Sequence, residues 1–234
     1  LGIREAVRRR YRALALAGQE GPAAQAGEGC CGPQPQAPAA SGCCRGDAFY
    51  TAEELAAVPA GAYLGAASGN PVRAAQLRPG ERVLDLGCGA GMDVFLAARR
   101  VGPEGTVVGI DMTPEMIERA QRLQRQAGVQ NVRFVLGTIE ELPFPDASFD
   151  VVISNCVINL SPDKPAVFRE ARRVLAPGGR LVVSDVVAER EVPPGLREDP
   201  ALDCSCTAGA MAEEAYVQAL QEAGFSEVRV LERQ

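Results

Sequence analysis

Between residues 82 and 187 the chain alternates short apolar runs with longer segments in which apolar residues recur at helical spacing. The short runs are continuous and rich in Val and Ile, which is typical of strands that helices cover on both faces of a parallel sheet. We expect strands at 82–88, 106–112, 132–137, 149–155 and 178–187, and helices at 93–101, 114–128 and 164–175. The pattern predicts an α/β fold with a doubly wound, mainly parallel sheet.

Two different segments precede this core. Residues 1–17 place apolar residues at helical spacing beside a run of arginines, which predicts an amphipathic helix with a solvated cationic face. Residues 18–47 are rich in Gly, Ala, Pro and Gln, a composition typical of a flexible linker. A short helix should then follow Thr51, because its hydroxyl and the Glu54 carboxylate form a capping-box pattern. We therefore expect one unit at 1–47 and the core domain at 48–190.

The end of the chain is less regular. An irregular stretch follows the core, and a helix near 212–224 and a strand at 226–232 close the sequence. We expect residues 191–234 to form a C-terminal segment beside the substrate. Since the chain ends soon after that strand and does not begin with Met, we also expect this covering segment to be incomplete.

Composition narrows the classes of function. At 234 residues and 47% hydrophobic content, the chain can bury a sizeable core. A net charge of −6 disfavours nucleic-acid binding, which relies on a basic surface. No apolar run approaches the roughly 20 residues of a membrane-spanning helix, and the arginine-rich start lacks the apolar core of a signal peptide. We expect a cytoplasmic monomer that acts on a small molecule, with no membrane or nucleic-acid partner.

The chain has eight cysteines and no histidine, so chemistry with a soft ion must rely on sulfur. None of the cysteines forms the CxxC pair of a zinc ribbon or a thioredoxin-like site. One thiol stands out: Cys156 follows the expected strand at 149–155, between two asparagines. The carboxyl end of that strand lies at the edge where open α/β sheets bind ligands, so this sulfur can face a bound substrate.

A glycine-rich turn follows the first expected strand, in the stretch "VLDLGCGAG" at 83–91. Glycines at 87, 89 and 91 permit a tight turn and a close approach of a ligand to the backbone. The spacing is one residue short of the GxGxxG pyrophosphate fingerprint, and Asp85 and Asp111 surround the turn with negative charge. Such a site suits a cationic amino-acid cofactor.

Residues 60–190 resemble the class I S-adenosylmethionine-dependent methyltransferases, with a Rossmann-like sheet. The resemblance rests on the glycine turn, on the acid that ends the second strand, and on "GTIEELPFPDASFD" at 137–150. It implies that the glycine turn holds the methionine part of the cofactor and that Asp111 binds the ribose hydroxyls. The cofactor residues it implies are Asp85, Gly87, Gly89, Gly91, Asp111, Met112, Ile139, Glu140 and Asn155.

Longer stretches are similar to the arsenite methyltransferases: "SNCVINLSPDK", "RVLAPGGRLVVSDVV" and "CTAGAM". This resemblance implies that Cys156 and Cys206 are catalytic and hold trivalent arsenic, as arsenite or methylarsenite, beside the methyl donor. It also implies a thiol reductant, glutathione or thioredoxin, as co-substrate. No general base is needed, because thiolate-bound arsenic already has the lone pair that attacks the sulfonium methyl.

The chain departs from that family at one expected ligand. Ser68 stands in "LGAASGNP" where members often have a third cysteine, and a hydroxyl is a poor substitute for a thiolate. Either two thiolates suffice, or Cys204 supplies the third, since residues 204 and 206 of an extended segment point the same way about 7 Å apart. Tyr11 is a weak match to a family tyrosine near the cofactor, and Cys88 is explained as a small buried residue.

Two adjacent cysteine pairs lie in the expected linker, at 30–31 and 43–44. They resemble the "CCG" clusters upstream of bacterial members, where a mobile arm would capture arsenic, but an exposed linker without a catalytic role explains them as well.

Two other functions stay open: a methyltransferase of the same fold for carbon, oxygen or nitrogen of a small metabolite, and a metalloid-binding protein without turnover. The sequence leaves the number of methyl groups added undecided.

Overall fold

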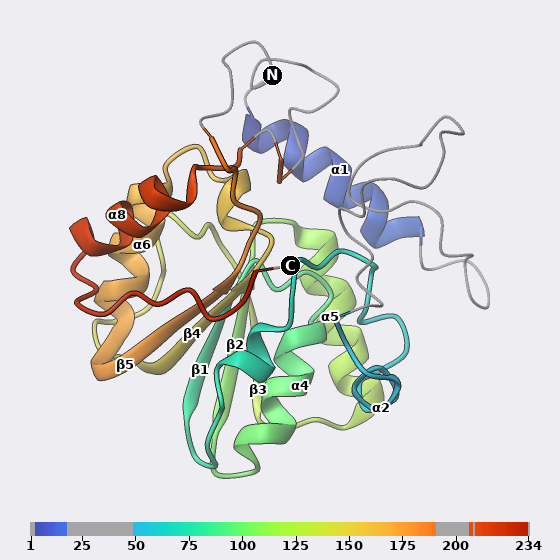
Figure 1. Cartoon of the computed structure of the whole chain (residues 1–234). Helices are drawn as coiled ribbons and strands as arrows, with labels where there is room; N and C mark the ends of the chain where they lie inside the picture. The colour runs from blue at the N-terminus through green and yellow to red at the C-terminus, as the bar shows by residue number, and fades with distance from the viewer. Residues whose placement is uncertain (1–2, 18–48, 191–205, 208, 234) are drawn as a thin grey trace.

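A computed structural model describes residues 3–17, 49–190, 206–207 and 209–233. Its five strands form one sheet in the order β3-β2-β1-β4-β5, and all neighbours are parallel, as the apolar runs predict (Figure 1). The strands are β1 (Arg82–Leu86), β2 (Thr106–Asp111), β3 (Val132–Leu136), β4 (Phe149–Asn155) and β5 (Leu175–Ser184).

Helices cover both faces of this sheet. One core lies between the sheet and the pair α4 and α5, and the other lies between the sheet and the pair α6 and α8 (Figure 1). Within β1, Val83 joins the first core while Leu84 and Leu86 join the second, because successive side chains of a strand point to opposite faces. The helices are α4 (Met92–Val101), α5 (Pro114–Ala127), α6 (Lys164–Val174) and α8 (Glu213–Glu222).

The register of the sheet brings three strand ends together. Leu86, the last residue of β1, pairs with Ile110 of β2 on one side and with Ser154 of β4 on the other. The glycine turn, Asp111 and Asn155 therefore follow at the same edge of the sheet. This carboxyl edge is where doubly wound folds bind their ligands.

The helix α1 (Ile3–Ala17) confirms the amphipathic segment expected at the start of the chain. Arg8 and Arg9 are exposed, as a solvated cationic face requires, whereas Val7 and Ala15 are buried. The apolar face packs on α5 and on the short 3-10 helix η2 (Ile158–Leu160). The helix α1 thus lies across the carboxyl edge of the sheet and covers it.

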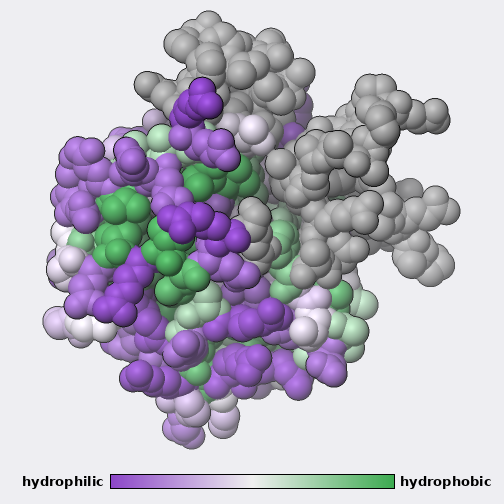
Figure 2. Space-filling model, in the orientation of Figure 1, coloured by the Kyte–Doolittle hydropathy of each residue, from purple (hydrophilic) through white to green (hydrophobic). Residues whose placement is uncertain are grey.

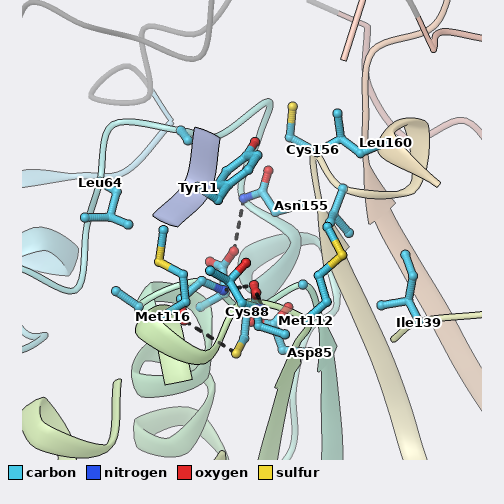
Figure 3. Close-up of a pocket in the computed structure, with 18 of the residues that line it drawn as sticks. Tyr11, Leu64, Asp85, Cys88, Met112, Met116, Ile139, Asn155, Cys156 and Leu160 are labelled. Atoms are coloured by element: carbon cyan, nitrogen blue, oxygen red, sulfur yellow. Dashed lines mark hydrogen bonds between the residues drawn. The ribbon is translucent and has the colours of Figure 1, made fainter. Parts of the chain in front are cut away.

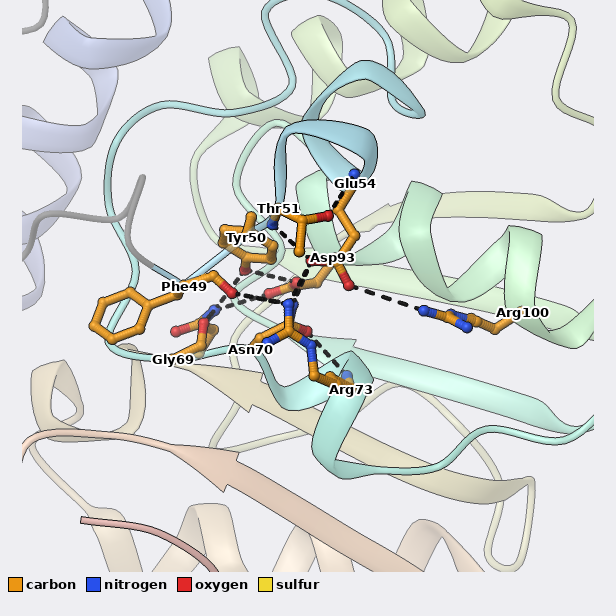
Figure 4. Close-up of polar contacts among 10 residues, drawn as sticks. Phe49, Tyr50, Thr51, Glu54, Gly69, Asn70, Arg73, Asp93 and Arg100 are labelled. Atoms are coloured by element: carbon orange, nitrogen blue, oxygen red, sulfur yellow. Dashed lines mark hydrogen bonds and ion pairs between the residues drawn. The ribbon is translucent and has the colours of Figure 1, made fainter. Parts of the chain in front are cut away.

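The segment between α1 and β1 is fixed by polar contacts. The capping box is confirmed at the start of α2 (Ala52–Ala56). Thr51 Oγ accepts a hydrogen bond from Glu54 N, and the Glu54 carboxylate accepts one from Thr51 N. Glu54 also pairs with Arg73 at 2.7 Å, in α3 (Pro71–Ala74), and with Arg100 at 3.9 Å (Figure 4). These contacts fasten the segment to the helices beside the glycine turn.

The closing helix is confirmed as α8, but the strand expected at 226–232 is wrong. No strand within the described residues pairs with that segment, and an extended segment without hydrogen-bonded neighbours is not a strand. Val230 and Leu231 are 45% and 69% exposed. Figure 2 shows apolar surface on the side where Figure 1 draws α8 and the C-terminal segment.

Several predictions lie outside the described residues: the linker at 18–47 with its four cysteines, and Cys204. Among the helices of residues 3–17, 49–190 and 209–233, none has both the length and the apolar character to cross a bilayer.

Candidate active site

A pocket opens at the carboxyl edge of the sheet, under α1. Side chains from α1, from the segment before α3, and from the ends of β1, β2 and β4 line it (Figure 3). Of the expected cofactor residues, the lining includes Asp85, Gly87, Gly89, Asp111, Met112, Ile139, Glu140 and Asn155. The structure therefore brings together residues that are up to 70 positions apart in sequence.

The floor of the pocket is a buried hydrogen-bond network around Asn155 and Asp93. Asn155 Nδ2 donates to Asp93 Oδ2 at 3.0 Å and to Tyr50 Oη at 2.9 Å, and Tyr50 donates to Asp93 Oδ1 at 2.8 Å. Asn155 Oδ1 accepts from Ser68 N at 3.0 Å. Every polar group of Asn155 is thus engaged, so its position is fixed before any ligand binds. Neither Asp93 nor Tyr50 was predicted from the sequence as part of the site.

The floor is also rich in carboxyl groups. Burial raises the pKa of Asp93 to about 6, and burial with the nearby acids Asp93 and Asp111 raises the pKa of Asp85. Burial raises the pKa of Asp111 too, although Asp111 accepts hydrogen bonds from Gly89 N at 3.0 Å and Thr113 N at 2.8 Å. A bound cation would lower these raised pKa values, because it favours the charged form of each acid. The residues present therefore fit a cationic cofactor.

The glycine turn shows why side chains are excluded there. Gly87 and Gly89 have positive φ angles of 68° and 51°, which favour glycine, and a Cβ on Gly87 would collide with Val157. Gly91 has φ 95° at the N-cap of α4 and packs against Phe134 without lining the pocket. A direct contact of Gly91 with a ligand stays a prediction.

The opposite wall carries Ile139 and Glu140. Glu140 accepts from Ser161 Oγ at 2.6 Å and pairs with Arg4 of α1 at 3.3 Å. The helix α1 also supplies Tyr11, which points toward the pocket in Figure 3. The weak match of Tyr11 to a residue near the cofactor is therefore consistent with its place in the fold.

The two predicted catalytic thiols come together beside this pocket. Cys156 Sγ and Cys206 Sγ lie 2.7 Å apart, and both residues are buried. Cys156 has a φ of 57°, which is uncommon for a residue with a side chain, and its N donates to Ser184 O at 2.8 Å. Strain of this kind is often kept where it orients a functional group.

The surroundings of the thiols are mostly apolar. Val7 of α1 and Leu160 of η2 are buried against them, with Met112 and Val186 partly buried at the margin. A hydrogen bond from Ala188 N to Met211 O, at 2.8 Å, holds the segment that follows Cys206 against the chain after β5. This side of the pocket thus combines two buried sulfur atoms with an apolar enclosure.

A carboxyl group also faces the thiol pair, and it was not predicted from the sequence. A carboxylate oxygen of Asp185 and the two sulfurs all lie within 4.8 Å of one another. Burial raises the pKa of Asp185 to about 7, against hydrogen bonds from the backbone N of Val186 and Asn159. The signal was available, because Asp185 directly follows β5 and β5 pairs with β4, so both strands end at one edge.

Ser68 and Cys156 share one hydrogen-bond acceptor. Ser68 Oγ donates at 2.8 Å to Ser184 O, which also accepts from Cys156 N. The hydroxyl is thus committed to the backbone of β5. Cys88 is buried and would contact a Cβ on Gly109, which agrees with a packing role.

Comparison with known proteins decides the family. Residues 77–224 match the family model described as "Methyltransferase domain". The chain belongs to this methyltransferase family. The curated relatives include the arsenite methyltransferase of Halobacterium salinarum, 46% identical over 97% of this chain and 58% of that protein. Another is the arsenite methyltransferase of Aquipseudomonas alcaligenes, 45% identical over 68% of this chain and 48% of that protein.

A solved structure agrees with these relatives. The arsenic(III) S-adenosylmethionine methyltransferase CrArsM from Chlamydomonas reinhardtii matches with a TM-score of 0.61 and 41% identity, over 67% of this chain and 62% of that chain. The resemblance to arsenite methyltransferases and the class I methyltransferase fold are therefore confirmed. This methyltransferase chain spans about half to three-fifths of the length of the relatives it matches.

Proposed function

We propose that this methyltransferase transfers a methyl group from S-adenosylmethionine to trivalent arsenic held by Cys156 and Cys206. The observation that carries the proposal is the pair of buried sulfurs, 2.7 Å apart, beside a pocket floored by carboxylates. One thiophilic atom can contact both sulfurs. The names of the relatives and of the matching structure agree with this substrate.

Residues at one end of the pocket would bind the cofactor, and residues at the other end would bind arsenic. The carboxylates of Asp85, Asp93 and Asp111 would hold the cationic cofactor. Asn155 and Tyr50 keep Asp93 in place, and the backbone N of Gly89 and of Thr113 keep Asp111 in place. S-adenosylmethionine, when bound, supplies a methyl group on a sulfonium. The two thiolates would orient the arsenic lone pair toward that methyl group, and α1 would exclude water from above.

Arsenic gains the methyl group with its own lone pair, so it is oxidised from the trivalent to the pentavalent state. A thiol reductant such as glutathione or thioredoxin would return it to the trivalent state while forming a disulfide. Arsenite and methylarsenite are both proposed substrates. We further propose a cytoplasmic monomer that binds no nucleic acid, which agrees with the net charge of −6.

The test is incubation with arsenite, S-adenosylmethionine and glutathione, followed by separation of the arsenic species. Methylated arsenic should accumulate together with S-adenosylhomocysteine. Arsenite binding without any methylated product would favour a metalloid-binding protein. S-adenosylhomocysteine formed only with an organic acceptor would instead favour a methyltransferase for another small molecule.

A further inference from the structure

The acid beside the thiol pair has no role in the transfer described above. Asp185 contributes a carboxylate oxygen within 4.8 Å of both Cys156 Sγ and Cys206 Sγ. Three groups therefore converge on one point, two of them soft and one hard. An atom bound by both thiols would lie within reach of this oxygen.

The chain holds Asp185 in a defined orientation. Asn159 Nδ2 donates to Asp185 Oδ1 at 2.8 Å, and Val186 N donates to the same oxygen at 3.0 Å. Among the described residues, the one donor to Asp185 Oδ2 is Asn159 N, at 3.2 Å. Two carboxylate oxygens can accept about four hydrogen bonds, so the group keeps capacity for one more donor.

The chemistry of the two arsenicals differs at this third position. When arsenite, As(OH)3, reacts with two thiols, two As–O bonds break, two As–S bonds form, and two water molecules leave. One hydroxyl stays on arsenic. When methylarsenite, CH3As(OH)2, reacts in the same way, both hydroxyls leave as water and the third substituent is a methyl group.

We propose that Asp185 accepts a hydrogen bond from the one hydroxyl that remains on dithiol-bound arsenite, and so favours inorganic arsenite over methylarsenite. This inference rests on the function proposed above. It gives the site an oxygen partner for arsenic where Ser68 replaces a third thiol and commits its own hydroxyl to Ser184 O. Asp185 is then a specificity-determining residue for the first methylation.

The experiment compares the binding of arsenite and methylarsenite, by calorimetry, to the full chain and to Asp185→Asn. Serines at the cysteines of 30–31, 43–44 and 204 keep the arsenicals from binding elsewhere. The isosteric change should weaken arsenite binding at least about tenfold, since it removes a charge-assisted hydrogen bond. Methylarsenite binding should change less than about twofold. The exposed acid Glu189, changed to Gln, is the matched control and should alter neither affinity.

The outcomes separate this inference from the proposed function. An equal loss for both arsenicals would show that Asp185 only supports the structure, and unchanged arsenite binding would exclude the hydrogen bond; either result overturns the inference. If Cys156→Ser bound arsenite as well as the parent chain did, the dithiol site itself would fail. Should Asp185→Asn not fold, Asp185→Ser is expected to show the same selective loss.

A third thiol provides an independent check. In Ser68→Cys, three thiolates would displace all three hydroxyls, so no arsenic-bound hydroxyl would remain for Asp185 to hold. Adding Asp185→Asn to Ser68→Cys should therefore leave arsenite affinity within about twofold. A full tenfold loss in that double variant would contradict the inference.

Discussion

The two ends of the pocket are built in opposite ways. At the cofactor end, Tyr50, Asp93 and Asn155 form a closed set of hydrogen bonds with distances of 2.8–3.0 Å. At the substrate end, Cys156 and Cys206 lie among apolar side chains from α1 and η2, with the carboxyl group of Asp185 beside them. The first end is arranged for a cation and the second for a soft atom.

The difference shows how one edge of a sheet can hold two reactants of different chemistry. In the proposed function, carboxylates would attract the charged cofactor, while the apolar enclosure would keep water from the arsenic and leave the sulfurs as its main ligands. If this division is correct, changes at one end should affect one reactant and spare the other.

The largest difference between the effects on the two ligands is expected from Asp111→Ala at the cofactor end. Two hydrogen bonds from the ribose to a charged acceptor are worth about 1.5 to 3 kcal/mol each, so S-adenosylmethionine should bind at least about 100-fold more weakly. Arsenite binding should be unchanged. Calorimetry with each ligand tests both statements, and thermal unfolding checks for the loss of the Gly89 and Thr113 contacts. An unchanged cofactor affinity would remove Asp111 from the binding site.

The buried acid Asp93 should give the protein a characteristic pH dependence. Its pKa is raised from 3.8 to about 6 by burial, so the folded state binds the proton more tightly than the unfolded state does. Its contribution to the free energy of unfolding therefore falls as pH rises from 3.8 through about 6, by at most about 3 kcal/mol.

Asp93→Asn removes this titration. The free energy of unfolding of both proteins, measured with denaturant at several pH values, should show that the variant gains stability relative to the parent protein as pH rises. Any constant effect of losing an acceptor for Tyr50 cancels, because only the pH dependence is compared. A difference that does not vary with pH would show that the pKa of Asp93 is the same in the folded and unfolded states.

At the substrate end, Gly209→Ala should misplace Cys206. A Cβ on Gly209 would collide with the backbone oxygen of Asn159, so the segment carrying Cys206 must shift. A displacement of about 1 Å in a reacting group can reduce turnover about 100-fold. Arsenite methylation should fall by about this factor, whereas cofactor affinity should stay the same. A parallel loss of both would argue against two separate ends.

The smallest effect is expected from the four cysteines at 30–31 and 43–44. Changing all four to serine should leave turnover measurable at saturating arsenite, because their segment has the composition of a linker and not of a packed site. The half-saturating arsenite concentration is the quantity that could rise. Complete loss of product at every arsenite concentration would make this arm part of the catalytic centre.

The cofactor end could be predicted from sequence because its main groups lie at the ends of strands that are neighbours in the sheet. Asp85, Asp111 and Asn155 each lie at or next to a strand end, and parallel strands bring their carboxyl ends to one edge. Asp93 was missed because it lies in the first turn of α4, where an acid is already explained by its favourable interaction with the helix dipole. The partner that buries it, Tyr50, is 43 residues away.

The substrate end depended more on tertiary structure. Cys156 was predicted from its place after a strand and from a family resemblance, and Cys206 from the resemblance alone. Their contact with Val7 joins segments that no local pattern connects. The solvated face of α1 was predicted from its arginines, but nothing in the pattern showed that its apolar face covers the pocket. The strand expected at 226–232 failed for a related reason: an apolar alternation predicts a strand only where a partner strand is available.

The most direct test of the two-ended site is a time course of arsenic species for Cys156→Ser and Cys206→Ser. With only one thiolate left, arsenic keeps a single flexible attachment and the in-line geometry is lost, so each change should abolish methylarsenic production. S-adenosylmethionine affinity should stay at the wild-type value, and Cys204→Ser should reduce the rate only modestly. Undiminished methylarsenic from either Cys156→Ser or Cys206→Ser would contradict the account.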